Sequence, residues 1–225
     1  MEAQTSIRLL DVEILEPVTV LTDLLVSAVC LYAYLKLRKQ KNKVSAVRLF
    51  SYYFLAMSIS TATGGIIGHG LQDILSYAWK VPTWIISMIS ITLIERAAIF
   101  HARPLLGNRM SKFFVWVNII ELLIMIAVLL VTFKFAIVGI HATYGLLVIV
   151  FSFELFIYVK KRDEASKLIL IAIGISALPA LVHLLKFSFG RWFNYNDIAH
   201  VLMALASYVF YLGARKIKAI DRSIS

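Results

Sequence analysis

Cysteine, proline and charged residues are all scarce in this sequence. Its single cysteine, Cys30, lies in an apolar segment, which excludes a disulfide framework and a cysteine-based metal site. Only 16% of the 225 residues are charged, and there are four prolines. Residues 1–16 are polar and mildly acidic, without a basic stretch before an apolar core, so we expect no cleavable signal peptide. We also find no lipidation motif.

Apolar segments occupy most of the chain, of which 60% is hydrophobic, with a mean hydropathy of +0.84. They run for about 20 residues each, which is long enough for a helix to cross ~30 Å of hydrocarbon. We therefore predict an all-α membrane protein, a seven-transmembrane helix bundle that forms a single domain over residues 1–225. The predicted spans are about 15–37, 47–68, 81–101, 113–133, 137–159, 168–187 and 198–214.

Lysine and arginine are concentrated in alternate loops. Seventeen of the 23 follow the first, third, fifth or last predicted span. The positive-inside rule then places the N-terminus outside and the C-terminus in the cytoplasm. The net charge of +10 is explained by a basic face toward anionic lipid headgroups, so we expect membrane lipids and no nucleic acid as partners. A homo-oligomer or another membrane subunit is a further alternative. The predicted location is a bacterial inner membrane or an endomembrane.

Four of the five histidines fall near the outer ends of predicted spans. His69 ends the second span and His183 lies near the end of the sixth. His141 and His200 lie near the starts of the fifth and seventh spans. The fifth histidine, His101, is expected at the solvated inner surface.

Carboxylates and an amide are expected at the same depth as these four histidines. Asp73 follows the second span, Asn196 and Asp197 open the last, and Asp23 lies in the outer half of the first. Imidazoles and carboxylates around an open position are the ligand set of a catalytic zinc site. Asp197, three residues before His200, could orient that imidazole through its second nitrogen. For each histidine alone, an interfacial imidazole bonded to backbone or water is the alternative.

Residues 196–200 (Asn-Asp-Ile-Ala-His), followed by Ser207 and Tyr208, resemble the last-helix signature of the alkaline ceramidase and progestin/adipoQ receptor superfamily of seven-span membrane hydrolases. In that superfamily the last helix opens with two histidines four apart, and a third histidine ends the second helix. His200 and His69 match two of these three positions. The resemblance implies a zinc ion held by three histidines, with a serine and an aspartate nearby, that activates water to hydrolyse a lipid amide.

The sequence departs from this pattern at three places. Asn196 stands where the first histidine of the pair belongs, Gly65 stands where the superfamily has a serine, and no aspartate opens the third span, although Asp73 is close. We expect His183 or His141 to supply the missing ligand. The predicted site therefore comprises the metal ligands His69, His200 and His183, the catalytic or supporting residues Asp73 and Asp197, and the binding residues Asn196, His141 and Asp23.

Two functions of different classes follow from this pattern. The first is a zinc-dependent hydrolase of lipid amides or esters that enter from the bilayer. The second is a metal-free protein of the same fold that binds a lipid, a small molecule or another membrane subunit. A haem protein is a weaker hypothesis, because no second histidine set is present at the inner leaflet.

Charged residues within the inner halves of the spans suggest a third function. A transporter or proton channel would use Glu95, Arg96 and Glu121, together with Asp23, but no inverted repeat is evident. The structural alternative is an ion pair of Arg96 with one of the two glutamates. Glu154 is expected at the interface, extending toward the basic loop 160–162.

Overall fold

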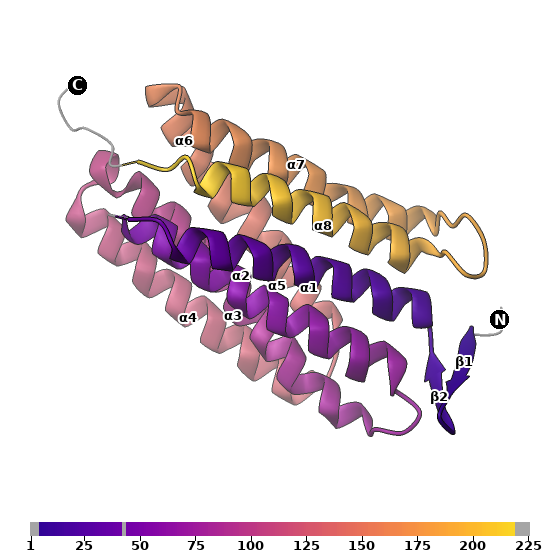
Figure 1. The fold of residues 1–225 in the computed structure, drawn as a ribbon. Helices are drawn as coiled ribbons and strands as arrows, with labels where there is room; N and C mark the ends of the chain where they lie inside the picture. Colours follow the sequence, from indigo (N-terminus) through magenta and orange to yellow (C-terminus); the bar gives the residue numbers. More distant parts are fainter. Residues whose placement is uncertain (1–4, 42–43, 219–225) are drawn as a thin grey trace.

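The computed structural model describes residues 5–41 and 44–218, which form a bundle of long helices with a short β-hairpin at the N-terminus (Figure 1). The hairpin consists of β1 (Ser6–Leu9) and β2 (Val12–Leu15). The α-helices are α1 (Pro17–Arg38), α2 (Ser45–Thr63), α3 (Lys80–Leu106), α4 (Asn108–Thr132), α5 (Ala136–Tyr144), α6 (Phe151–Lys161), α7 (Glu164–Leu185) and α8 (Tyr195–Ala214). Two π-helical segments, η1 (Gly64–Gly70) and η3 (Gly145–Val150), extend α2 and join α5 to α6, and a 3-10 turn, η2 (Tyr77–Trp79), precedes α3.

The all-α prediction is confirmed, and the helices fit an integral membrane protein. Six helical stretches are long and apolar enough to cross a membrane, namely those at Pro17–Arg38, Tyr77–Leu106, Asn108–Thr132, Ala136–Lys161, Glu164–Leu185 and Tyr195–Ala214. The stretch formed by α2 and η1 is not among them. Its second half contains Ser58, Ser60, Thr61 and Thr63, which lower its hydropathy.

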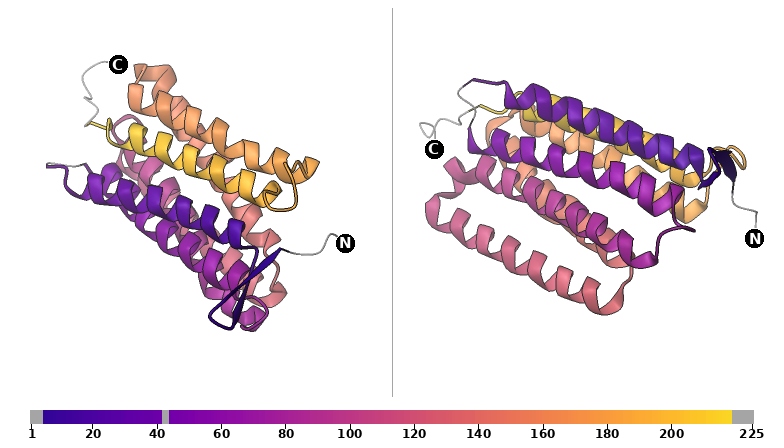
Figure 2. Two further views of the ribbon diagram at one scale, coloured as in Figure 1. Left: turned by 45° about the vertical axis from the view of Figure 1, so that its right-hand side comes forward. Right: turned by 60° about the horizontal axis from the view of Figure 1, so that its bottom comes forward.

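α1 occupies a central place in the bundle. It lies between α2 and α8, while α8 packs on α7, and α3 packs on α2 and α4 (Figure 2). α6 closes the arrangement by contacting both α3 and α7. Phe50 and Phe54 of α2 and Phe210 of α8 are fully buried in the main apolar core. The packing order brings the start of α1 next to both η1 and α8.

The outer face of α4 is apolar and exposed. Only Ser111, Asn118 and Leu129 of this helix are buried. Trp116 and Val131 are 65% and 83% exposed. A contiguous apolar face of this kind is unfavourable in water, and contact with lipid or with another apolar surface would remove it from water.

The N-terminal hairpin is a feature that the sequence analysis did not predict. Leu10 and Asp11 form its two-residue turn with φ of 47° and 65°. Glu16 follows the hairpin, and its backbone N–H donates to Thr5 O (2.8 Å). We call the end of the bundle that carries this hairpin, η1 and the loop 186–194 the hairpin end. The opposite end, with residues 39–41, 44, 162–163 and 215–218, is the basic end.

Two predictions at the basic end are wrong, because His101 and Glu154 are buried together instead of lying at the surface. His101 is 3% exposed and Glu154 is 0% exposed. His101 Nδ1 lies 3.1 Å from Glu154 Oε2, and Ser166 Oγ donates to the same oxygen (2.7 Å). These contacts offset the cost of burying the carboxylate and link α3, α6 and α7.

Replacing Glu154 by alanine would leave His101 and Ser166 buried without this partner. We expect the free energy of unfolding to fall by roughly 2–5 kcal/mol, the range for removing one member of a buried polar contact. Thermal unfolding in detergent measures the change. Glu164→Ala is the control, because its exposed carboxylate lies 4.0 Å from Lys216 Nζ, and exposed pairs of this kind contribute less than about 1 kcal/mol. Equal effects of both substitutions would contradict a stabilising role for the buried contact.

Candidate functional site

Five polar side chains gather at the hairpin end, where α1, η1 and α8 meet. Glu16 precedes α1, Thr22 and Asp23 lie in its second turn, His69 lies in η1, and His200 lies in the second turn of α8. We call these residues the two-histidine cluster. The side chains of His69, His200 and Asp23 are 29%, 15% and 9% exposed, so water reaches the edge of the cluster.

The two nitrogens of His69 face two different carboxylates. Its Nδ1 lies 2.5 Å from Glu16 Oε2, and its Nε2 lies 4.0 Å from Asp23 Oδ2. This hydrogen bond needs one proton, which we assign to Nδ1, so that Nδ1–H donates a hydrogen bond to Glu16 Oε2. In a neutral imidazole the lone pair is then on Nε2, which faces Asp23.

His200 is held in the same way on the other side of Asp23. Its Nδ1 lies 3.1 Å from Thr22 Oγ1, and its Nε2 lies 3.5 Å from Asp23 Oδ1. The Thr22 hydroxyl donates its only proton to Thr19 O (3.0 Å), so its oxygen accepts from His200 Nδ1–H. The lone pair of a neutral His200 is therefore also on Nε2, directed at the Asp23 carboxylate.

A glycine allows the backbone of η1 to approach Asp23. A Cβ atom at Gly65 would lie 2.7 Å from Asp23 Cβ and 3.3 Å from Asp23 Oδ2. Any side chain at this position would displace α1 or the carboxylate. Gly65 is thus required for the close approach that brings His69, four residues later, to Glu16 and Asp23.

Asp197 anchors α8 instead of contacting His200. It is fully buried, and its Oδ1 accepts from Thr19 Oγ1 (2.8 Å) while its Oδ2 accepts from Asn194 N (2.6 Å). Asn194 and Asp197 form the capping box at the start of α8. The nitrogen of His200 that Asp197 was predicted to orient meets Thr22, because Asp197 is engaged by α1 and by its own helix end.

The other predicted site residues are dispersed. Asp73 lies in the exposed turn after η1, and His183 is exposed with its ring against Tyr195, at a centroid distance of 5.3 Å. Asn196 is half-buried in the first turn of α8, where its backbone N–H donates to Asn194 Oδ1. His141 is fully buried elsewhere, with Nδ1 2.8 Å from Glu121 Oε1. The structure therefore brings together His69, His200 and Asp23 of the predicted set.

Glu16 and Thr22 belong to the site but were not predicted as parts of it. Glu16 and Asp23 are seven residues apart, which places them on nearly the same helix face, and this spacing was the available signal. Glu16 adopts φ 43° and ψ 52°, a left-handed conformation that few residues other than glycine adopt. Such strained positions are often found at functional sites.

A second polar cluster lies between α3, α4 and α5. Potential ligand atoms of Glu95, Glu121 and His141 all lie within 4.8 Å of one another, and among the described residues this is the one group of three that meets that spacing. The predicted ion pair of Arg96 with a glutamate is not found there, since Arg96 Nε donates to Asn118 Oδ1 (3.1 Å).

Comparison with known proteins gives a family match. Residues 18–219 match the Family of unknown function (DUF6962). No curated protein and no solved structure matches the chain. The family match includes η1, α8 and all of the two-histidine cluster except Glu16. Because it covers nearly the whole sequence, the chain belongs to the DUF6962 family.

Proposed function

We propose that this protein is a metal-dependent membrane hydrolase with its site in the two-histidine cluster. One observation carries the proposal: the Nε2 atoms of His69 and His200 both face the Asp23 carboxylate. Both imidazoles use the other nitrogen on a protein acceptor. Two imidazole nitrogens thus face one carboxylate, and a cation bound by all three groups would satisfy them.

These residues suit zinc. Two imidazoles and one carboxylate, with one position left open, form a known ligand set of catalytic zinc sites. Glu16 and Thr22 hold the non-ligating nitrogens, as the supporting partners of metal-binding histidines commonly do. Asp23 takes the place of the third ligand, for which the sequence analysis had considered His183 or His141. A bound zinc ion would supply Lewis acidity to activate water and polarise a carbonyl.

The residues around the ligands have positioning roles. Glu16 and Thr22 fix the ring orientation of His69 and His200, and Asp197 fixes the start of α8 against α1. Glu16 is also 19% exposed, so its carboxylate is reachable by water at the edge of the cluster. It is our candidate for accepting a proton from that water during hydrolysis.

We further propose that the chain spans the membrane seven times, with α2 and η1 as the seventh span. The hairpin end then faces outward, because lysine and arginine are concentrated at the basic end. Leu21 and Leu25 of α1 are 64% and 45% exposed, and each lies two residues from Asp23 in the sequence. A lipid amide or ester could reach the cluster from this apolar surface, in a bacterial inner membrane or an endomembrane.

A metal-free protein that binds a lipid or an accessory subunit is the competing function. It is favoured by Asn196, which stands at a ligand position of the superfamily that the sequence resembles. The spacing also favours a metal-free protein. Of the described residues, only Glu95, Glu121 and His141 have ligand atoms that all lie within 4.8 Å of one another, and His69, His200 and Asp23 do not. Metal binding separates the two functions.

Removing either imidazole should abolish zinc binding at this site. We expect the purified His69→Ala and His200→Ala variants in detergent each to contain one zinc ion per chain fewer than the wild-type protein. Elemental mass spectrometry measures the zinc content. His183→Ala, which alters an exposed histidine at the same end, should keep the wild-type content. A wild-type zinc content that neither substitution lowers would exclude the proposed site.

Thr22→Val should weaken zinc binding while leaving all three ligands in place. The substitution removes the oxygen that accepts from His200 Nδ1–H, and loss of such a supporting partner typically lowers metal affinity about 10–100-fold. Competition with a fluorescent zinc chelator measures the affinity. The control is Thr63→Val, because the Thr63 hydroxyl donates within its own helix, to Ile59 O and Ser60 O. Unchanged affinity in Thr22→Val would show that Thr22 does not orient His200.

Gly65→Ala should lower both the unfolding temperature and the zinc affinity, because the added Cβ would overlap Asp23. Gly65→Ser, which restores the residue of the superfamily, should do the same. The adjacent Gly64→Ala is a matched control, since nothing lies within 4 Å of a Cβ at that position. There we expect stability to be unchanged or raised by about 0.5–1 kcal/mol from helix propensity. If Gly65→Ala changed the unfolding temperature and the zinc affinity no more than Gly64→Ala does, the close approach of η1 to Asp23 would be contradicted.

A further inference from the structure

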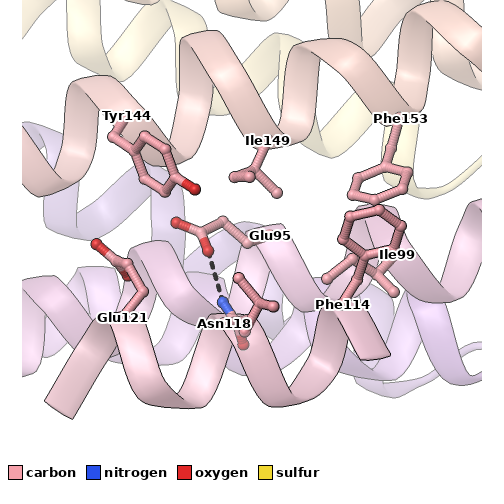
Figure 3. A pocket seen from close by; sticks show the side chains of 9 residues that line it. Glu95, Ile99, Phe114, Asn118, Glu121, Tyr144, Ile149 and Phe153 are labelled. Carbon is pink, nitrogen blue, oxygen red and sulfur yellow. Dashed lines mark hydrogen bonds between the residues drawn. The ribbon is translucent and has the colours of Figure 1, made fainter. Parts of the chain in front are cut away.

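The second polar cluster joins three helices in the interior of the bundle. Glu95 comes from α3, Glu121 from α4 and His141 from α5. Figure 3 shows the carboxylates of Glu95 and Glu121 on either side of the space below the Tyr144 ring, with Asn118 hydrogen-bonded to Glu95. The cavity beside them has a volume of about 10 Å³, which is room for about one water molecule or ion.

His141 directs a lone pair into this cluster. The side chain is fully buried, and its Nε2 lies 3.0 Å from Met88 O. A carbonyl can only accept, so Nε2 carries the proton and Nδ1 is the unprotonated nitrogen of a neutral ring. Nδ1 lies 2.8 Å from Glu121 Oε1, which is also an electron-pair donor when ionised. A proton shared by the two atoms would satisfy this contact, and so would a cation bound beside both of them.

Two buried carboxylate oxygens in the cluster have no hydrogen-bond partner among the residues that the structure describes. Glu95 is 1% exposed, and although its Oε2 accepts from Asn118 Nδ2 (2.5 Å), its Oε1 is without a partner. Glu121 Oε2 is likewise buried without a hydrogen-bond partner among the described residues. A Cβ at Gly145 would overlap Glu95 Oε1, so a glycine at the start of η3 makes room for this oxygen. Unsatisfied oxygens of this kind are costly unless a ligand is present.

The Arg96 guanidinium does not contact the Glu95 carboxylate directly. Asn118 lies between the two side chains: its Oδ1 accepts from Arg96 Nε, and its Nδ2 donates to Glu95 Oε2. The groups that face one another are therefore two carboxylates and one imidazole. A divalent cation matches the charge of the two carboxylates, and it would also use the two free oxygens and the Nδ1 lone pair.

We propose that Glu95, Glu121 and His141 form a binding site for one divalent first-row transition-metal ion, separate from the two-histidine cluster. One imidazole and two carboxylates suit Mn²⁺, Fe²⁺ or Zn²⁺. The bond from His141 Nε2–H to a backbone carbonyl is the usual support of a metal-binding histidine. The ion would hold α3, α4 and α5 together at the point where α5 passes into η3.

The test measures retained Mn²⁺ in the full-length protein in detergent after incubation with MnCl₂ and desalting. The His69→Ala/His200→Ala double variant is the parent, so that the two-histidine cluster does not contribute. We expect one Mn²⁺ per chain in the parent, loss of it after adding His141→Ala or the nearly isosteric Glu121→Gln, and retention after adding Glu154→Gln. The last substitution also changes a buried carboxylate that faces an imidazole.

A second measurement distinguishes loss of the metal site from loss of the fold. Mn²⁺ should raise the unfolding temperature of the parent and of the Glu154→Gln variant, but not that of the His141→Ala or Glu121→Gln variants. Absence of Mn²⁺ from the parent, or equal loss in the Glu154→Gln variant, would overturn the proposal. Because His141→Ala alone tests this site and His200→Ala alone tests the proposed catalytic site, either can fail without the other.

Discussion

The close approach of η1 to α1 at Gly65 is the contact on which the arrangement of the hairpin end depends. With no side chain at this position, the backbone of η1 lies against Asp23, and His69 reaches Glu16 and Asp23. α8 is attached to the same part of α1 by the buried bond between Thr19 and Asp197. One helix end thus fixes both imidazoles, because each is carried by a neighbour that packs on α1.

The two polar clusters have the same arrangement of a glycine, a carboxylate and an imidazole. In each, a glycine in a π-helical segment makes room for a carboxylate of a neighbouring helix, Gly65 for Asp23 and Gly145 for Glu95. In each, an imidazole lies four residues from that glycine, at His69 and at His141. A spacing of four places both on one helix face. Each carboxylate therefore lies against the backbone of a glycine and close to an imidazole, and both proposed metal sites depend on this arrangement.

The sequence was sufficient to predict the helices but not the composition of the site. Long apolar runs determine which segments are helical, and topology indicates which helix ends share a side of the bundle. Topology gives depth, however, and not the direction in which a side chain points around the bundle. His183, at a helix end on the predicted side, is exposed against Tyr195, and His141 turns toward Glu121. The hairpin and the π-helical segments were also beyond prediction, because four-residue strands and one added residue per turn leave little periodic signal.

In the proposed metal site, Asp23 would account for two departures from the ceramidase-like pattern. A carboxylate supplied by α1 would make a histidine at position 196 unnecessary, and Asn196 occupies that position in the first turn of α8. The same carboxylate excludes a serine at position 65, where a Cβ would lie 2.7 Å from Asp23 Cβ. The residues at 23 and 65 are therefore coupled by space. Placing the serine of the superfamily at position 65 while Asp23 remains in α1 brings the two side chains into conflict.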